Sequence, residues 1–188
     1  MEGSSVVNAY VNDQSREYLT PDYVGGELLF EVADQAFLNL GGGSSLFNES
    51  TYSGVCGSRT KLKVSGSGRV SFGHSAAFGS GKGTYGELVL EDNAYVYNTY
   101  WLVHIGGSAG TDATRPARGV AYISGGCLYC AGNESSSEQC LGIGVGTRKA
   151  NTGEAANVGE FYLSGGVVSN AVRSVFAVGY GDASGKVV

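Results

Sequence analysis

Cysteine and histidine are the residue types in this chain that are best suited to bind a metal or to act as nucleophile and base. The cysteines are Cys56, Cys127, Cys130 and Cys140, and the histidines are His74 and His104. Only one Cys-x-x-Cys pair occurs, whereas a zinc ribbon needs two, and both histidines lie far from that pair in the sequence. We therefore expect no metal site.

Disulfide bonds are one alternative for these cysteines, and free buried thiols are the other. Strand alternation points Cys127 outward and Cys130 inward, so these two should not pair with each other. Bridges between Cys130 and Cys140, or between Cys56 and either Cys127 or Cys140, stay open, because connectivity cannot be read from a sequence. Disulfides would fit an extracellular or cell-surface protein, which is the location we expect.

Acidic residues are the next candidates, because enzymes that cleave glycosidic bonds need two carboxyl groups at a defined separation. Acids gather only weakly, at Glu91-Asp92 and in the loop 134–138, and no convergent pair is evident. His104 stands between Val103 and Ile105, so alternation points it outward, and we expect it at the surface. The sequence predicts a protein that is not an enzyme, with no catalytic residue and no cofactor.

Charge and composition exclude several classes of partner. The net charge is −5 without a run of like charges, which argues against nucleic acid and against an anionic membrane surface. No stretch reaches the roughly 18 apolar residues of a membrane-spanning helix, and no secretion signal is evident at the start of this chain. With 32 glycines in 188 residues and many tyrosines and valines, the composition favours an all-β protein with glycine turns.

A repeat of three short strands organises the chain from about residue 26 onward. The first strand of each copy alternates apolar and variable residues and ends at Val32, Val64, Leu90, Ile123 and Leu163. The second strand is centred on Phe37, Val70, Val96, Leu128 and Val168. The third strand ends in apolar-x-apolar-Gly, at Gly79, Gly106, Gly144 and Gly179, with Leu46 or Phe47 as the candidate in the first copy. Alternation with period two is typical of half-buried strands.

Repeats of this kind predict a solenoid, because a single copy cannot bury its own apolar face. The expected fold is all-β, a single-stranded right-handed parallel β-helix of about five to six rungs. Residues 1–25 would form a lead-in or a partial first rung, and residues 26–188 the repeat array. The rungs are expected near 26–59, 60–85, 86–118, 119–158 and 159–188.

An asparagine ladder is expected at the bend after the second strand. The residues two positions beyond the strand centres include Asn39, Asn98 and Asn170. Stacked amides inside a solenoid can hydrogen-bond to the backbone and to one another. The alternative is that asparagine tolerates the left-handed backbone of a turn.

Tyrosines give the best case for a binding surface. The register makes Tyr122 and Tyr162 neighbours in one outward column, and Tyr97 and Tyr129 neighbours in another. Such rings can contact sugars or a partner protein, and they also stabilise sheets as cross-strand pairs. Both readings stay open.

The segments "LKVSGSGRVSFG", "AYISGGCLYC", "FYLSGGVVSN" and "VFAVGYGDASG" resemble the repeats of right-handed parallel β-helix proteins. The likeness is to bacterial autotransporter passengers and adhesin-like surface proteins, over about residues 26–188. It implies a non-catalytic structural or adhesive module, with surface glycans or proteins as partners.

Two other functions remain as alternatives. Lys186, Val187 and Val188 match the opening of a further rung, so this edge is a candidate for end-to-end assembly of copies of the chain into a filament or coat. A carbohydrate-active β-helix enzyme of the lyase or hydrolase type is the other, and it would require acids that converge on one face.

Overall fold

Three parallel β-sheets build the described part of the chain, and each of the four rungs from β4 (Arg59–Val64) to β15 (Val175–Tyr180) contributes one strand to each sheet. The computed structural model describes residues 6–11, 27–42, 59–73, 76–79, 84–99, 103–107, 117–131, 139–145, 157–170, 175–180 and 183–188. Sheet 1 contains β2 (Glu27–Val32), β4 (Arg59–Val64), β7 (Tyr85–Leu90), β10 (Arg118–Ile123), β13 (Val158–Leu163) and β16 (Ser184–Val187). Sheet 2 contains β1 (Val6–Val11), β3 (Phe37–Gly42), β5 (Arg69–Phe72), β8 (Tyr95–Asn98), β11 (Cys127–Cys130) and β14 (Val167–Asn170). Sheet 3 contains β6 (Ala76–Phe78), β9 (Val103–Ile105), β12 (Gln139–Val145) and β15 (Val175–Tyr180).

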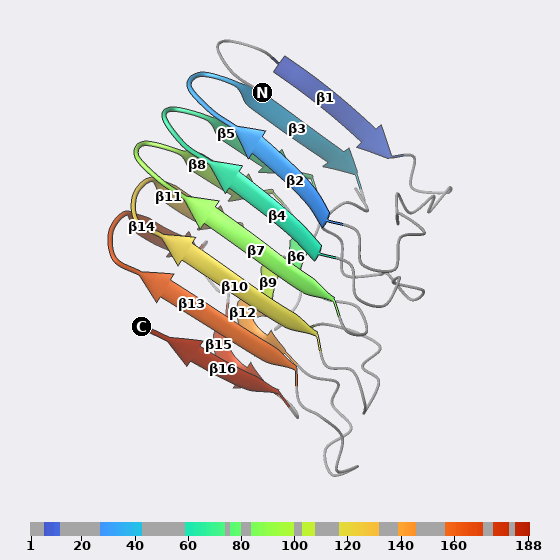
Figure 1. Cartoon of the computed structure of the whole chain (residues 1–188), viewed down its shortest axis with the longest axis vertical. Helices are drawn as coiled ribbons and strands as arrows, with labels where there is room; N and C mark the ends of the chain where they lie inside the picture. Colours follow the sequence, from blue (N-terminus) through green and yellow to red (C-terminus); the bar gives the residue numbers. More distant parts are fainter. Residues whose placement is uncertain are drawn as a thin grey trace.

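The strands stack into a column. The chain runs through a strand of sheet 1 at the front, turns at the left into sheet 2 behind it, continues through sheet 3, and returns one level lower (Figure 1). This path is right-handed, the hand that crossovers between parallel strands almost always take. The protein is a parallel β-solenoid, and the predicted fold class is confirmed.

The predicted register of sheet 1 is confirmed by the pairing of its strands. Val32 pairs with Val64, Val64 with Leu90, Leu90 with Ile123, and Ile123 with Leu163. The third strands also pair as predicted, with Ala76, Val103, Leu141 and Phe176 in one column. Alternation therefore located both strands correctly, although the loops between them differ in length.

The second strand of the first rung is shifted by one residue from the predicted register. Leu38, rather than Phe37, pairs with Val70, and Asn39 pairs with Ser71. The turn between Val32 and Leu38 is one residue longer than the turns of the last two rungs, and it follows the four-residue pattern in which Ala36 N–H donates to Ala33 O at 3.0 Å.

The expected asparagine ladder is wrong at Asn39 for the same reason, whereas Asn98 and Asn170 lie in the predicted column. The column that contains Asn98 and Asn170 holds Leu40 in the first rung, and Cys130 separates the two asparagines. Asn39 lies in a neighbouring column, so no two of the three predicted members are in contact through the register. Asn98 is buried in the core, with none of its surface exposed.

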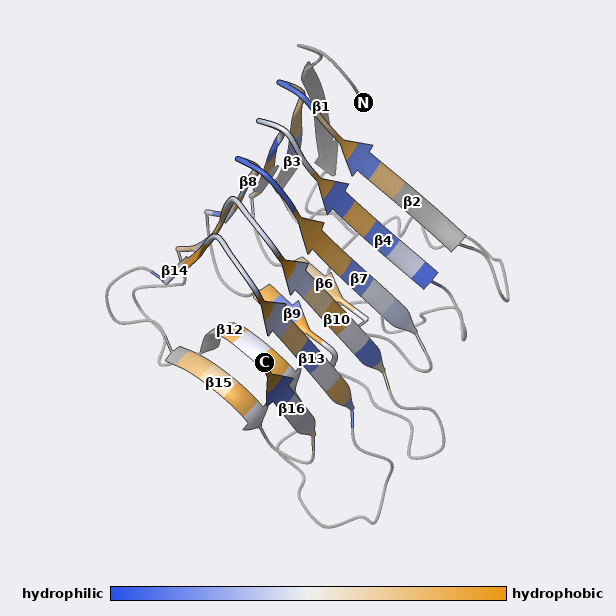
Figure 2. Ribbon diagram, turned by 60° about the vertical axis from the view of Figure 1, so that its left-hand side comes forward, coloured by the Kyte–Doolittle hydropathy of each residue, from blue (hydrophilic) through white to orange (hydrophobic). Residues whose placement is uncertain are grey.

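Apolar side chains from all three sheets fill the inside of the column. Inward and outward residues alternate along the strands of sheet 1, as the bands of hydrophobic and hydrophilic colour show (Figure 2). Phe72 and Phe78 pack edge to face with ring centroids 6.3 Å apart, and both are fully buried. Their contact joins sheet 2 to sheet 3 within one rung.

The glycine that ends each third strand has a structural cause. Gly106 has a φ of 75°, a conformation that side chains with a Cβ adopt only at a cost. A Cβ at this position would also overlap the carbonyl oxygen of Val158, at the start of the strand β13. The end of sheet 3 therefore packs backbone against backbone on the beginning of sheet 1.

In the part of the chain that the structure describes, no helix is long and apolar enough to cross a membrane. Among the same residues, no group of three or more His, Cys, Asp or Glu side chains is arranged to hold a metal ion.

Candidate binding site

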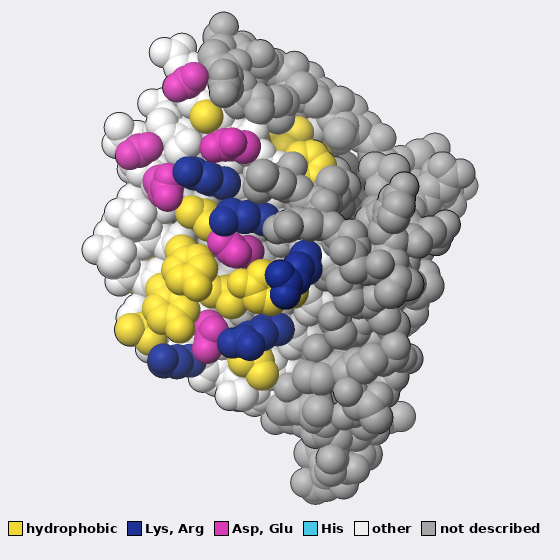
Figure 3. Space-filling model, viewed as in Figure 1, with side chains coloured by type: hydrophobic (Ala, Val, Ile, Leu, Met, Phe, Trp, Pro, Cys, Tyr) yellow, Lys and Arg dark blue, Asp and Glu magenta, His cyan; other side chains and the backbone are white. Residues whose placement is uncertain are grey.

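The outward side chains of sheet 1 form three columns along the solenoid axis. Parallel register places equivalent residues of neighbouring strands side by side, about 4.8 Å apart. The first column contains Arg59, Tyr85, Arg118, Val158 and Ser184. The second contains Lys61, Glu87, Val120, Glu160 and Lys186. The third contains Glu31, Lys63, Val89, Tyr122 and Tyr162. We call these columns the sheet 1 face; basic and apolar side chains gather on it, with acids between them (Figure 3).

Ion pairs join neighbouring rungs on the sheet 1 face. Lys61 Nζ lies 2.8 Å from Glu87 Oε1, which is a close pair. Arg118 Nη2 lies 3.4 Å from Glu160 Oε2, and the Arg118 side chain is 58% exposed. An ion pair at this exposure stabilises a protein by only about 0–1 kcal/mol. A ligand can therefore replace the contact between Arg118 and Glu160 at little cost.

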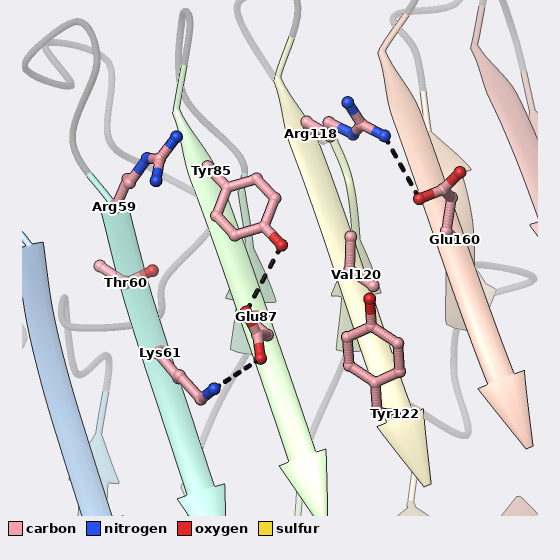
Figure 4. A pocket seen from close by; sticks show the side chains of 9 residues that line it. All are labelled: Arg59, Thr60, Lys61, Tyr85, Glu87, Arg118, Val120, Tyr122 and Glu160. Atoms are coloured by element: carbon pink, nitrogen blue, oxygen red, sulfur yellow. Dashed lines mark hydrogen bonds and ion pairs between the residues drawn. The ribbon is translucent and has the colours of Figure 1, made fainter.

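A groove of about 370 Å³ lies in the middle of this face. Its floor is Val120, whose short side chain stands between the longer side chains of Glu87 and Glu160 in the second column. Two strand spacings, about 9.6 Å, separate these glutamates along the axis. Arg118 and Tyr122 lie on either side of Val120 on the same strand (Figure 4). The remaining lining residues are Arg59, Thr60, Lys61 and Tyr85.

Tyr85 forms part of the wall and is held by its neighbours. Its hydroxyl donates to Glu87 Oε2 at 3.4 Å, and Arg59 Cζ lies 5.6 Å from the centre of its ring. Burial raises the pKa of the Tyr85 hydroxyl, and the negative charge of Glu87 raises it further. The hydroxyl therefore stays protonated at neutral pH and acts as a donor.

Lys63 lies just outside the groove, on the same face. Its ammonium is 3.1 Å from Glu91 Oε2, and this hydrogen bond, together with the charge of Glu91, raises the pKa of Lys63. Lys63 is thus a permanent cation that shares the sheet 1 face with the groove but does not line it.

Tyr122 and Tyr162 are neighbours, as the register predicts. Their rings are stacked, with centroids 5.2 Å apart and an angle of 13° between the planes. Lys186 Nζ, from the strand on the other side, lies 5.6 Å from the centre of the Tyr162 ring. The faces of the Tyr162 ring are therefore covered by neighbours, whereas Tyr122 is 42% exposed and lines the groove. A role of either tyrosine in ligand binding stays a prediction.

Tyr97 and Tyr129 pair in register on sheet 2, away from the groove. Both are half-buried, and the Tyr97 ring packs against Tyr95 with centroids 5.4 Å apart. Arg69 Cζ lies 5.7 Å from the centre of the Tyr95 ring. This second aromatic group is separate from the site on sheet 1.

The cysteines of strand β11 point to opposite sides of it. Cys127 is half-buried and Cys130 is fully buried, and no disulfide joins them. This agrees with the expectation that they do not pair with each other. Cys56 and the side chain of Cys140 lie outside the described residues, so the bridges that involve them stay predictions.

Burial raises the pKa of the Cys127 thiol above its ordinary value of 9.0. Because the thiolate is the reactive form, we expect iodoacetamide to modify Cys127 several-fold more slowly than a cysteine in an unstructured peptide at pH 8. Peptide mapping by mass spectrometry measures the rate. The midpoint of the rate against pH should lie above 9.0, and a midpoint at or below the value of the peptide would contradict the burial that we describe.

Two further expectations concern single positions. His104 is 3% exposed, so the expectation that it lies at the surface is wrong. It points away from the core in register with Ala77 and Gly142, which are also buried, so an outward position on sheet 3 is not a solvent-exposed one. His74, Leu46 and Phe47 lie outside the described residues.

The predicted assembly edge is a paired strand of sheet 1. Lys186 pairs with Glu160 and Val187 with Phe161, so the match to the opening of a rung is confirmed. Val187 and Val188 are 46% and 59% exposed. Association of this edge with another copy of the chain stays a prediction.

The residues of the groove lie at fixed distances from the ends of the first strands, which the sequence identifies. The floor and the acids of the groove lie three residues before the strand ends Leu90, Ile123 and Leu163. Its arginines lie five residues before the strand ends Val64 and Ile123. The pattern within one strand does not show the depression, because the depression depends on a short side chain between two long ones from the neighbouring rungs.

Comparison of the chain with protein-family models, with curated proteins and with solved structures finds no match in any of the three. The class that the fold defines is the parallel β-solenoid.

Proposed function

We propose that this chain is a non-catalytic extracellular or cell-surface module with a structural or adhesive function, comparable to the passengers of bacterial autotransporters and to adhesin-like surface proteins. The observation that carries the proposal is the ordered sheet 1 face. Residues that are 26 to 42 positions apart in sequence lie side by side there, in ion pairs and in a ring stack.

A rigid outer face suits adhesion better than it suits catalysis. Each strand is hydrogen-bonded to its neighbours in register, so the outward side chains keep fixed spacings along the axis. Fixed spacing reduces the entropy that is lost when an extended partner binds. The same property would serve a stalk that holds other parts of a surface protein at a distance.

The two glutamates of the groove support a non-catalytic role. A catalytic acid or base has to present its carboxyl oxygens to the scissile bond, within hydrogen-bond reach of the atom that it protonates or deprotonates. Glu87 is paired with Lys61 and Glu160 with Arg118. This arrangement favours binding over the acid and base chemistry of a glycoside hydrolase.

Incubation with a panel of polysaccharides tests the proposal. We expect some of them to retain the protein in a pull-down assay, without new reducing ends or unsaturated products over a day. Steady release of shorter chains would contradict the non-catalytic part. Antibodies against the purified protein should label intact cells of the source organism; label only after lysis would contradict the location.

A further inference from the structure

The groove on the sheet 1 face has the size and the lining of a ligand site. Its volume of about 370 Å³ lies within the range of about 300–1,000 Å³ that is usual for small-ligand pockets. An apolar floor, Val120, is surrounded by polar groups from four neighbouring strands. This combination fixes both the position and the orientation of a ligand.

Positive charge is in excess among the side chains of the groove. Arg59, Lys61 and Arg118 are cationic, and Glu87 and Glu160 are anionic, which leaves one net positive charge in a chain whose net charge is −5. Lys61 is held closely by Glu87, whereas the contact of Arg118 is longer and its side chain is 58% exposed. Arg118 also lies on the same strand as Val120 and Tyr122, whereas Arg59 lies two strands away over the ring of Tyr85, so Arg118 is the exposed cation nearest to the middle of the groove.

The other groups of the groove match the ring of a sugar. Carboxylates accept hydrogen bonds from hydroxyl groups, and Glu87 and Glu160 present theirs on opposite sides of Val120. Tyr122 offers an aromatic surface whose position is fixed by its stack on Tyr162. Val120 is only 3% exposed and closes the bottom of the groove, so the C–H groups of a pyranose ring can lie on Tyr122, which is 42% exposed, while its hydroxyl groups reach the acids.

We propose that this groove binds one anionic sugar unit of a polysaccharide, that is, a pyranose ring that bears a carboxylate or a sulfate. The anion contacts the guanidinium of Arg118, which can form two parallel hydrogen bonds with it, and replaces the longer contact of Arg118 with Glu160. The proposal rests on the adhesive form of the proposed function, for which it names the ligand class.

Titration calorimetry with three tetrasaccharides tests this site. The probes are a mannuronate tetramer, a sulfated galactose tetramer and the uncharged cellotetraose. We expect at least one anionic probe to bind at least tenfold more tightly than cellotetraose, because hydrogen bonds to a charged group are stronger than neutral ones. A preference for the first or the second probe identifies the anion as carboxylate or sulfate.

Two groove variants and one control locate the binding. R118Q removes the guanidinium at an exposed position and should weaken binding about tenfold or more. V120Y fills the floor of the groove without a change of charge and should abolish binding. K63Q removes a cation from the same face outside the groove and should change the affinity less than about twofold. Circular dichroism and thermal melts show whether each variant is folded.

The outcomes separate this site from the proposed function. Equal losses in R118Q and K63Q, tight binding of cellotetraose, or no binding of any probe would each overturn the anionic sugar site and leave a non-catalytic structural role intact. Binding that depends on Arg118, followed by cleavage of the probe, would support the site and overturn the non-catalytic function.

Discussion

Replacement of Gly106 by alanine should destabilise the solenoid by about 4 kcal/mol or more, a loss that few single substitutions cause. The φ of 75° alone disfavours alanine by about 1–2 kcal/mol. The larger part comes from overlap of the new Cβ with the carbonyl oxygen of Val158. Neither backbone can move away, because Gly106 N–H donates to Phe78 O at 2.8 Å and Val158 N–H donates to Ala117 O at 2.9 Å.

Gly179 provides the matched control for this prediction. It also has a positive φ, 65°, and occupies the equivalent position of the last third strand. The nearest atoms to a Cβ there are Gly185 N at 3.4 Å and Ala183 O at 3.6 Å, so only the backbone cost of about 1–2 kcal/mol applies. Urea unfolding of both variants measures the difference, and equal losses would contradict the backbone packing between sheets 3 and 1.

Replacement of Phe78 by alanine is the second large effect that we expect. Phe78 is fully buried and packs edge to face against Phe72, so its loss leaves a cavity between sheet 2 and sheet 3. Removal of a buried phenylalanine side chain costs about 3–5 kcal/mol. The midpoint of urea unfolding should fall accordingly, and near-ultraviolet circular dichroism should report the loss of ordered aromatic packing.

Phe176 is the control for Phe78, because it lies in the same sheet but is 48% exposed. Its replacement by alanine removes about half of the transfer free energy of a phenylalanine and leaves no closed cavity, so we expect a loss of about 1 kcal/mol. A larger loss of unfolding free energy for the Phe176 variant than for the Phe78 variant would contradict a core that lies between the sheets around Phe78.

The register of sheets 1 and 3 could be predicted because each rung buries the same kind of residue at the same position. Leu62, Leu88, Ala121 and Phe161 illustrate this column of inward apolar side chains. The glycine at the end of the third strand also helped to locate that strand. At Gly106, a positive φ and the close contact with neighbouring backbone leave no room for a side chain.

The second strand of the first rung was predicted one residue too early, because the length of the turn before it does not follow from the sequence alone. Turns with one more or one fewer residue both end in apolar strands, and a slip of one residue turns every side chain to the other side. Leu38 and Phe37 are both apolar, so the pattern did not distinguish them. Asn39 was therefore assigned to the wrong column.

The groove was harder to predict than the fold, because it depends on relations between rungs. The importance of Val120 follows from its size relative to Glu87 and Glu160, which lie 33 and 40 residues away in the sequence. His104 gave the opposite error, since a side chain that points outward from a sheet can still be buried. Local periodicity carries neither kind of information.

A titration of ¹⁵N-labelled protein with the preferred anionic tetrasaccharide, observed by two-dimensional NMR, tests the central claim most directly. We expect amide shifts to change in strands β4, β7, β10 and β13 around Val120, while the anomeric signals of the sugar stay unchanged over a day. Shifts centred on sheet 2 or sheet 3, no shifts at all, or new anomeric signals from cleaved sugar would contradict a non-catalytic binding site on the sheet 1 face.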